Sequence, residues 1–276
     1  MIKNTLIVSD LDGTLLSSAK TISDQTASYL KGLQDKGAKI LLASGRPYRA
    51  IKPYYDQIGL EGYIVCYNGG MIINPEDNNI IFKKQFPKDL IFDIINQIGP
   101  SNFENVMVED MNNIYLETDS NIMDYFLFSK GMNIKRGHLE DNVKNDVYEA
   151  VFCLKDYTYY NKLLELGSTS KYKDINIRFW SGMLVAELYF NDINKYTSIE
   201  KVSKIYGLEN KDIICIGDAN NDIEMIHRAG IGIGMKNTTS KFVKQTASML
   251  SLDDNDHDGV MKTLQLLVHD DEIFSK

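Results

Sequence analysis

The sequence predicts an α/β protein in which a parallel-sheet domain is interrupted by a second, inserted α+β domain. Towards both ends of the 276-residue chain, short apolar segments alternate with segments of helical periodicity. This alternation is typical of parallel strands joined by crossover helices. In the middle of the chain the strands instead alternate polar and apolar residues, which is typical of antiparallel strands. We expect one domain from residues 1–83 and 191–276, and an inserted domain from residues 84–190.

The N-terminal segment supplies strands and helices in strict alternation. Ser23-Asp24 is a helix-start signal and Gly37 a stop signal, and together they bound the first expected helix. A second helix is expected over residues 49–58. The flanking apolar segments predict buried strands over residues 5–9, 38–43 and 63–67.

The C-terminal segment repeats this pattern. It predicts helices over residues 195–206, 222–228, 240–245 and 260–268, and strands over residues 212–216 and 231–234. The Gly-rich sequence GIGIGM (230–235) lacks the spacing of a dinucleotide-binding loop and is interpreted as a tightly packed core strand.

The inserted domain is expected to contain half-exposed antiparallel strands, including the segments NIYLET and LVAELYF, with helices near residues 88–98 and 158–166. Trp180, with Arg178 and Phe179, has two interpretations here. It could close over a sugar substrate, or it could pack against the sheet of this domain.

Composition limits the possible partners and compartments. The net charge of -8 argues against nucleic acid or an anionic membrane as a partner, but it allows small anionic substrates. The three cysteines have wide spacing and no CxxC pair, which favours buried thiols in a reducing compartment. No apolar run is long enough to span a membrane, so a cytoplasmic protein is expected. The oligomeric state is open between a monomer and a small homo-oligomer.

Polar groups follow three of the predicted parallel strands. Asp10 and Asp12 follow the first, Ser44 and Gly45 the second, and the sequence GDANND (217–222) a later one. Ligands of open parallel sheets bind at the carboxyl ends of the strands, so these groups should converge there. A cluster that also contains Asp218 and Asp222 requires a cation, and oxygen ligands of this type suit Mg²⁺.

Each of these motifs has an ordinary structural alternative when it stands alone. The Asp-Gly pair is common in turns, Ser44-Gly45 is compatible with a plain loop, and GDANND with a helix N-cap. The acidic segment 254–259 begins like an EF-hand, but its twelfth position is Gln265 instead of Glu. We interpret this segment as a loop that caps the last helix.

Together the motifs are far more specific. In chain order they are DLDGTLL (10–16), LASGRPY (42–48), YNGG (67–70), Lys195, GDANND (217–222) and DGV (258–260). With them the chain resembles the haloacid dehalogenase-like (HAD) phosphohydrolases, and among these the Cof-like group with a type IIB α/β cap inserted after the third core strand. The resemblance covers nearly the whole chain and implies a Rossmann-like HAD core with a substrate-specificity cap.

The resemblance implies a role for each acidic residue. Asp10 is expected to be the nucleophile that forms an aspartyl-phosphate, and also a metal ligand. Asp12 is expected to be the general acid and base, with its backbone carbonyl as a further metal ligand. Asp218 supplies a second metal carboxylate, and Asp222 orients the metal waters or the lysine.

The resemblance also implies a phosphate site. The Ser44 hydroxyl, the Leu11 and Gly45 amides, Asn221 and Lys195 are expected to hold the phosphoryl oxygens. Thr14 is expected to fix the loop instead of touching substrate. The family's lysine lies in a segment resembling SKG, whereas this chain reads Asn194-Lys195-Tyr196. Lys201 and Lys204 are therefore alternatives to Lys195.

The expected function is a Mg²⁺-dependent phosphatase that acts on a small phosphorylated metabolite, most plausibly a sugar phosphate. One alternative is a phosphotransferase or phosphomutase, because mutases share a related core and cap. Another is a non-catalytic sensor of phosphometabolites, which the complete set of carboxylates argues against.

Overall fold

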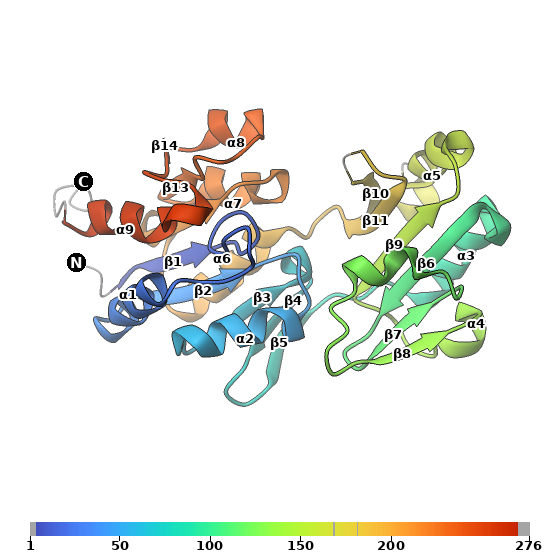
Figure 1. Cartoon of the computed structure of the whole chain (residues 1–276), viewed down its shortest axis with the longest axis horizontal. Coiled ribbons are helices and arrows are strands. Elements are labelled where there is room, and N and C mark those ends of the chain that lie inside the picture. The colour runs from blue at the N-terminus through green and yellow to red at the C-terminus, as the bar shows by residue number, and fades with distance from the viewer. Residues whose placement is uncertain (1–3, 168, 181, 270–276) are drawn as a thin grey trace. The chain divides into compact units, whose positions relative to one another are not determined.

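The chain divides into two compact units, which the computed structural model describes over residues 4–167, 169–180 and 182–269 (Figure 1). The first unit joins the chain up to Lys83 to the chain from Asn194 onward, and the second unit is Lys84–Ile193. The chain therefore returns to the first unit after Ile193 and not after residue 190. In Figure 1 the first unit is blue and orange to red, and the second is green to yellow.

The first unit is built on a sheet whose described strands have the order β14-β13-β12-β1-β2-β3-β4-β5. The strands from β14 to β3 are parallel, and β4 and β5 are added antiparallel. The strands are β1 (Leu6–Ser9), β2 (Lys39–Ala43), β3 (Ile64–Cys66), β4 (Met71–Asn74), β5 (Asn79–Lys83), β12 (Ile213–Gly217), β13 (Ile231–Gly234) and β14 (Met249–Leu250).

The register of this sheet brings the predicted polar groups to one edge. Ser9 lies opposite Ile216 of β12 and Leu42 of β2. The next residue, Asp10, therefore leaves the sheet between the ends of its two neighbours. The five predicted parallel strands are confirmed, whereas the β4–β5 hairpin and the two-residue β14 were not predicted.

Ile7 and Val8 are neighbours in β1, so their side chains point to opposite faces of the sheet. Both side chains are buried, which shows that both faces of the sheet are covered. Side chains of α6, α7 and α8 pack on the face that contains Val8. Ser23 caps α1 as expected, and Gly59, with φ of 75°, ends α2. The helices are α1 (Asp24–Asp35), α2 (Tyr48–Ile58), α6 (Lys195–Ile205), α7 (Ile223–Arg228), α8 (Lys241–Thr246) and α9 (Gly259–His269).

The second unit is a sheet with the order β10-β11-β9-β6-β7-β8, antiparallel except for the β7–β8 pair. Its strands are β6 (Phe103–Glu109), β7 (Asn113–Leu116), β8 (Asn133–Arg136), β9 (Glu149–Leu154), β10 (Ile175–Phe179) and β11 (Val185–Phe190). Its helices are α3 (Lys88–Ile98), α4 (Leu139–Asn142) and α5 (Tyr160–Gly167).

The expectation of half-exposed strands is wrong for the two central strands of this sheet. Phe152 belongs to a buried cluster that includes side chains of α3 and α5, whereas its neighbour Val151 belongs to a separate buried cluster. Met123 lies in that second cluster, and Trp180 packs against it. Of the two interpretations of Trp180, the structure therefore shows packing against the sheet. Within the described residues, no helix combines the length and apolar character that a membrane crossing requires.

Candidate active site

The turn after β1 places two aspartates at the sheet edge. The Asp10 backbone amide donates to the Ile216 carbonyl at 3.0 Å, which extends the β1–β12 pairing by one residue. The Leu11 side chain is fully buried. Gly13 has φ of 77°, and a Cβ atom there would lie 2.5 Å from Asp218 Oδ2. Glycine is therefore required for the turn to pass beside Asp218.

Lys195 connects the two halves of the site. It is the first residue of α6, and the preceding Asn194 caps the helix by accepting a hydrogen bond from the Thr197 amide at 3.0 Å. Lys195 Nζ donates to Asp10 Oδ1 at 2.5 Å and to Asp222 Oδ1 at 2.6 Å. The lysine side chain is fully buried, so these ion pairs are shielded from water.

The two alternative lysines lie elsewhere. Lys201 Nζ donates to the Thr197 carbonyl at 3.1 Å, and Lys204 pairs with Glu200 at 3.3 Å on the same helix. Among the three lysines considered from the sequence, Lys195 is the one that contacts Asp10.

Asp218 and Asp222 occupy different positions after β12. Asp222 Oδ2 accepts hydrogen bonds from the Asp218 and Ala219 amides, both at 3.0 Å. With Lys195 on its other oxygen, Asp222 acts as an anchor for its surroundings. Asp218 Oδ1 accepts a hydrogen bond from the Thr14 hydroxyl at 2.9 Å, so Thr14 fixes the loop after β1 against the loop after β12.

The carboxylates of Asp10, Asp218 and Asp222 form a group suited to a divalent cation. One oxygen of each lies within 4.8 Å of the others. Burial raises the pKa of Asp10 to about 8 against the opposing charge of Lys195, and burial with the Asp222 charge raises the pKa of Asp218 to about 6. Three ionised carboxylates and one ammonium leave two negative charges, which a dication neutralises. Because both Asp222 oxygens already accept hydrogen bonds, Asp10 and Asp218 are the better ligands.

Asp12 lies in a separate cationic environment. Arg46 donates to both Asp12 oxygens at 2.6 Å, and Lys20 Nζ donates to Oδ1 at 2.6 Å. Partial burial would raise the pKa of Asp12, but its hydrogen bonds and charge interactions with Arg46 and Lys20 hold that pKa below its usual value. Arg46 and Lys20 therefore hold this carboxyl group in its ionised form.

The expected phosphate-binding residues lie around Ser44. Its hydroxyl is buried and accepts a hydrogen bond from the Arg46 amide at 3.2 Å. Asn68, with φ of 52°, donates its backbone amide to the Ser44 carbonyl at 3.0 Å and accepts from Asn221 Nδ2 at 2.9 Å. A Cβ atom on Gly45 would lie 3.0 Å from the side-chain nitrogen Nδ2 of Asn68. Asn68 thus links the loop after β2, which carries Ser44, to the loop after β12, which carries Asn221.

Sequence reasoning gave no role to Arg46, Asn68 or Lys20. Arg46 and Asn68 lie inside motifs that the sequence analysis quoted, so their position at the sheet edge was a usable signal. Lys20 follows the motif by several residues and had no such signal.

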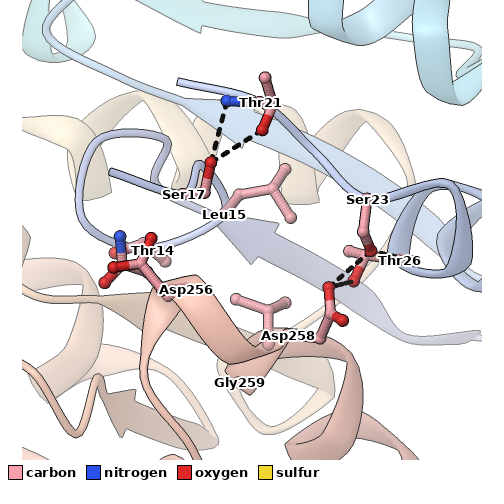
Figure 2. Close-up of a pocket in the computed structure, with 11 residues that line it drawn as sticks. Thr14, Leu15, Ser17, Thr21, Ser23, Thr26, Asp256, Asp258 and Gly259 are labelled. Atoms are coloured by element: carbon pink, nitrogen blue, oxygen red, sulfur yellow. Dashed lines mark hydrogen bonds between the residues drawn. The ribbon is translucent and has the colours of Figure 1, made fainter. Parts of the chain in front are cut away.

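The acidic C-terminal loop is hydrogen-bonded to the N-terminal segment. It borders a polar pocket of about 170 Å³ whose opposite wall includes Thr14, Ser17 and Thr21 (Figure 2). Asp258 Oδ1 accepts hydrogen bonds from the Ser23 and Thr26 hydroxyls at 2.5 and 2.8 Å.

A second acidic group in the described residues lies in this loop and comprises Asp253, Asp254 and His257. Lys262 donates to Asp253 at 2.8 Å and supplies positive charge. The ion pair joins the acidic loop to α9, and capping of that helix by the loop stays a prediction.

Comparisons with known proteins agree with this arrangement. Residues 7–264 match the family described as haloacid dehalogenase-like hydrolase. The chain is 32% identical to 5-amino-6-(5-phospho-D-ribitylamino)uracil phosphatase YitU of Bacillus subtilis, over 95% of this chain and 97% of that protein. A crystal structure of a haloacid dehalogenase-like hydrolase from Bacteroides thetaiotaomicron superimposes with a TM-score of 0.83 at 28% identity, covering 95% of this chain and 99% of the other.

A further likeness also covers nearly the whole chain. The subclass IIB sugar phosphatase BT4131 has the same fold, with a TM-score of 0.76 at 20% identity over 96% of this chain and 99% of that one. The chain belongs to the haloacid dehalogenase-like hydrolase family. It is a phosphatase, a hydrolase of phosphoric monoesters, and members of this family generally use a divalent metal.

Proposed function

We propose that this phosphatase is Mg²⁺-dependent and hydrolyses a small sugar or sugar-alcohol phosphate through an aspartyl-phosphate on Asp10. The observation that carries the proposal is the buried Lys195 ammonium between Asp10 and Asp222, with Asp218 beside them. A nucleophilic carboxylate needs a neighbouring cation when a phosphate dianion approaches, and this site provides one and has room for another.

In the first step, a carboxylate oxygen of Asp10 attacks phosphorus and the bond to the leaving alcohol oxygen breaks. Asp12 donates the proton that the alcohol requires. Five residues hold the phosphoryl oxygens so that the attacking and leaving oxygens are aligned. They are Lys195, Asn221, Ser44 through its hydroxyl, and Leu11 and Gly45 through their amides. Lys195 also favours the ionised form of Asp10 against the effect of burial and holds its carboxylate in place by a hydrogen bond.

In the second step, water attacks the phosphorus of the aspartyl-phosphate and regenerates Asp10. Asp12 takes a proton from that water, and inorganic phosphate leaves. The hydrogen bonds from Arg46 and Lys20 keep Asp12 ionised before this step and fix the orientation of its carboxylate.

The residues that would hold Mg²⁺ are Asp10, Asp218 and the backbone carbonyl of Asp12, with Asp222 and Thr14 orienting them. When bound, the ion neutralises charge on the transferring phosphoryl group. The hard oxygen ligands and the two unbalanced negative charges of the acidic group support Mg²⁺ over softer metals.

Two findings support the substrate class. The name of the relative YitU specifies a phosphate ester on a ribityl chain, and BT4131 is described as a sugar phosphatase. We propose that the inserted domain, residues 84–190 as predicted and Lys84–Ile193 in the structure, selects the substrate as a cap. We further propose that the enzyme works in the cytoplasm, where its three buried thiols stay reduced.

The test is phosphate release from a panel of phosphorylated metabolites, measured with Mg²⁺ and with EDTA. We expect Asp10→Asn to lower kcat at least ~10³-fold while the protein stays folded by circular dichroism, because the nucleophile is lost. Asp35→Asn, an exposed carboxylate paired with Lys31, is the matched control and should keep full activity.

Wild-type turnover by Asp10→Asn would refute the nucleophile assignment, and equal rates with EDTA would refute the metal assignment. Adding sugar acceptors to the assay separates hydrolysis from phosphoryl transfer. A phosphorylated acceptor in place of inorganic phosphate would show that the enzyme is a transferase.

A further inference from the structure

Lys20 lies outside every motif of the site, yet its ammonium reaches the proposed acid and base residue. Lys20 Nζ donates to Asp12 Oδ1 at 2.6 Å, on the same carboxylate that Arg46 binds with two hydrogen bonds. Arg46 is buried, whereas the Lys20 side chain is 54% exposed. An exposed lysine in a freely moving loop would lose most of the benefit of such a pair to side-chain and backbone entropy.

The loop that carries Lys20 is not free in this structure. The Ser17 amide donates a hydrogen bond to the Thr21 carbonyl at 3.0 Å. The Ser17 hydroxyl also lies 2.8 Å from the Thr21 hydroxyl and accepts from the Thr21 amide at 3.2 Å (Figure 2). Lys20 itself has φ of 60°, in the left-handed region that lysine rarely adopts. The turn therefore holds Lys20 in an uncommon backbone conformation.

Two outside contacts secure the same turn. The Tyr54 hydroxyl on α2 donates to the Lys20 carbonyl at 3.0 Å, and the Tyr54 ring lies 5.6 Å from the Arg46 guanidinium carbon. On the other side, Asp256 accepts hydrogen bonds from the Ser18 amide and hydroxyl at 2.6 and 2.7 Å. Tyr54 thus contacts the backbone of Lys20 and the guanidinium of Arg46, the two residues that hold Asp12.

We propose that Lys20 is a positioning residue for Asp12, and that the Ser17–Thr21 turn, held by Tyr54 and Asp256, serves to present its ammonium. This inference rests on the proposed role of Asp12. Both Asp12 oxygens accept hydrogen bonds from cations here, so Lys20 and Arg46 together fix the orientation of the carboxylate. Water must lose a proton to Asp12 whereas a good leaving group needs none, so a misplaced Asp12 slows hydrolysis of the aspartyl-phosphate more than its formation from such a substrate.

The decisive experiment is rapid-quench kinetics with p-nitrophenyl phosphate and Mg²⁺. p-Nitrophenolate leaves without needing a proton, so formation of the aspartyl-phosphate should not depend on Asp12, whereas its hydrolysis should. We expect Lys20→Asn to slow that hydrolysis about tenfold, so that a burst of up to about one equivalent of p-nitrophenolate appears and phosphoenzyme accumulates.

The variants separate the ammonium from the turn. Asparagine tolerates the left-handed conformation, so Lys20→Asn removes the cation and leaves the backbone unstrained. Lys20→Arg should restore wild-type kinetics, and Tyr54→Phe should give a smaller burst in the same direction. Lys52→Met, which breaks an exposed pair with Asp56 on the same helix as Tyr54, is the matched control and should show no burst.

Asp12→Asn distinguishes failure of this inference from failure of the proposed function. If Asp12→Asn accumulates phosphoenzyme and Lys20→Asn behaves as wild type, Lys20 does not position Asp12. If Asp12→Asn itself accumulates none, the base assignment fails first. A Lys20→Asn protein that is slower without a burst would also overturn the inference, because a merely structural defect slows both steps.

Discussion

Asp218, a proposed metal ligand, shows how one side chain of the candidate site affects stability. Burial and the Asp222 charge raise its pKa to about 6, and burial raises that of Asp10 to about 8. Without a metal, the folded protein therefore binds more protons than the unfolded chain between about pH 4 and pH 8. The free energy of unfolding should fall as pH rises through this window, and bound metal should reverse the loss.

We predict that Asp218→Asn stabilises the metal-free protein at pH 8, because it removes one of the crowded charges. A gain of about 1 kcal/mol would raise Tm by ~2–4 °C for a chain of this size. The same variant should lose the stabilisation by Mg²⁺ and most of the activity. The measurement is thermal unfolding at pH 5.5 and pH 8, each with EDTA and with Mg²⁺.

The stabilising effect of Asp218→Asn should largely vanish at pH 5.5, where the wild-type carboxyl is mostly protonated. Asp35→Asn again serves as the control and should not respond to Mg²⁺ differently from the wild type. A variant less stable than the wild type at pH 8 without metal would show that charge crowding is not the dominant effect.

At the same scale, the sequence predicted the position of a residue better than its contacts. Asp10, Asp12 and Asp218 were placed at the sheet edge because each lies shortly after a predicted parallel strand, and their roles were inferred from the family resemblance. The capped helix start at Asn194 makes Lys195 reach the same edge despite its altered motif. Lys20 was not predicted, because its ion pair depends on a left-handed turn whose residues give no periodic signal.

At the scale of the element, the start of α6 determines where the Lys195 ammonium lies. Asn194 and Thr197 form a reciprocal capping box directly around the lysine. We predict that Asn194→Ala costs about 1 kcal/mol in the free energy of unfolding, as for other N-caps. It should also lower kcat/KM about tenfold or more, since small displacements of a positioning cation are costly.

The matched control is Ser23→Ala, which removes the N-cap of α1 away from Lys195. It should cost a similar amount in chemical denaturation but change kcat/KM less than twofold. Equal losses of activity in both variants would show that the cap acts through general stability alone.

Elements also show where the pattern of a strand misleads. The parallel strands were recognised because burial on both faces makes them continuously apolar. β6 and β9 of the second unit are also buried on both faces. On one face, part of the side-chain layer that buries them comes from Met123, which lies in a short 3₁₀ segment without helical periodicity. The cover of a sheet face is a tertiary property, and residues 121–126 carry no local sign of it.

At the scale of the whole molecule, the two units have separate hydrophobic cores. The clusters of the second unit draw on residues between Phe86 and Ile193, and that of the first unit on residues outside this range. We predict that Mg²⁺ slows amide hydrogen exchange in β1 and β12 and leaves β6 and β9 unchanged, because the proposed ligands stabilise only the first unit.

Asp218→Asn is the control for the exchange experiment and should abolish the protection of β1 and β12. Equal protection of all four strands in the wild type would show that the two units open together, and the separate cores would then not be independent in stability.

The strand order has a consequence for synthesis of the chain. β1 pairs with β12, so Leu6 can pair with Ile213 only after the chain has been synthesised as far as β12. The strands of the second unit are contiguous in the sequence and leave the ribosome together, well before that point. A nascent chain therefore exposes Asp10 and Asp12 long before Lys195, Asp218 and Asp222 exist beside them. A chain released before Lys195 has half of an acidic site and no lysine, so the proposed site can assemble only after Asp222 has been synthesised.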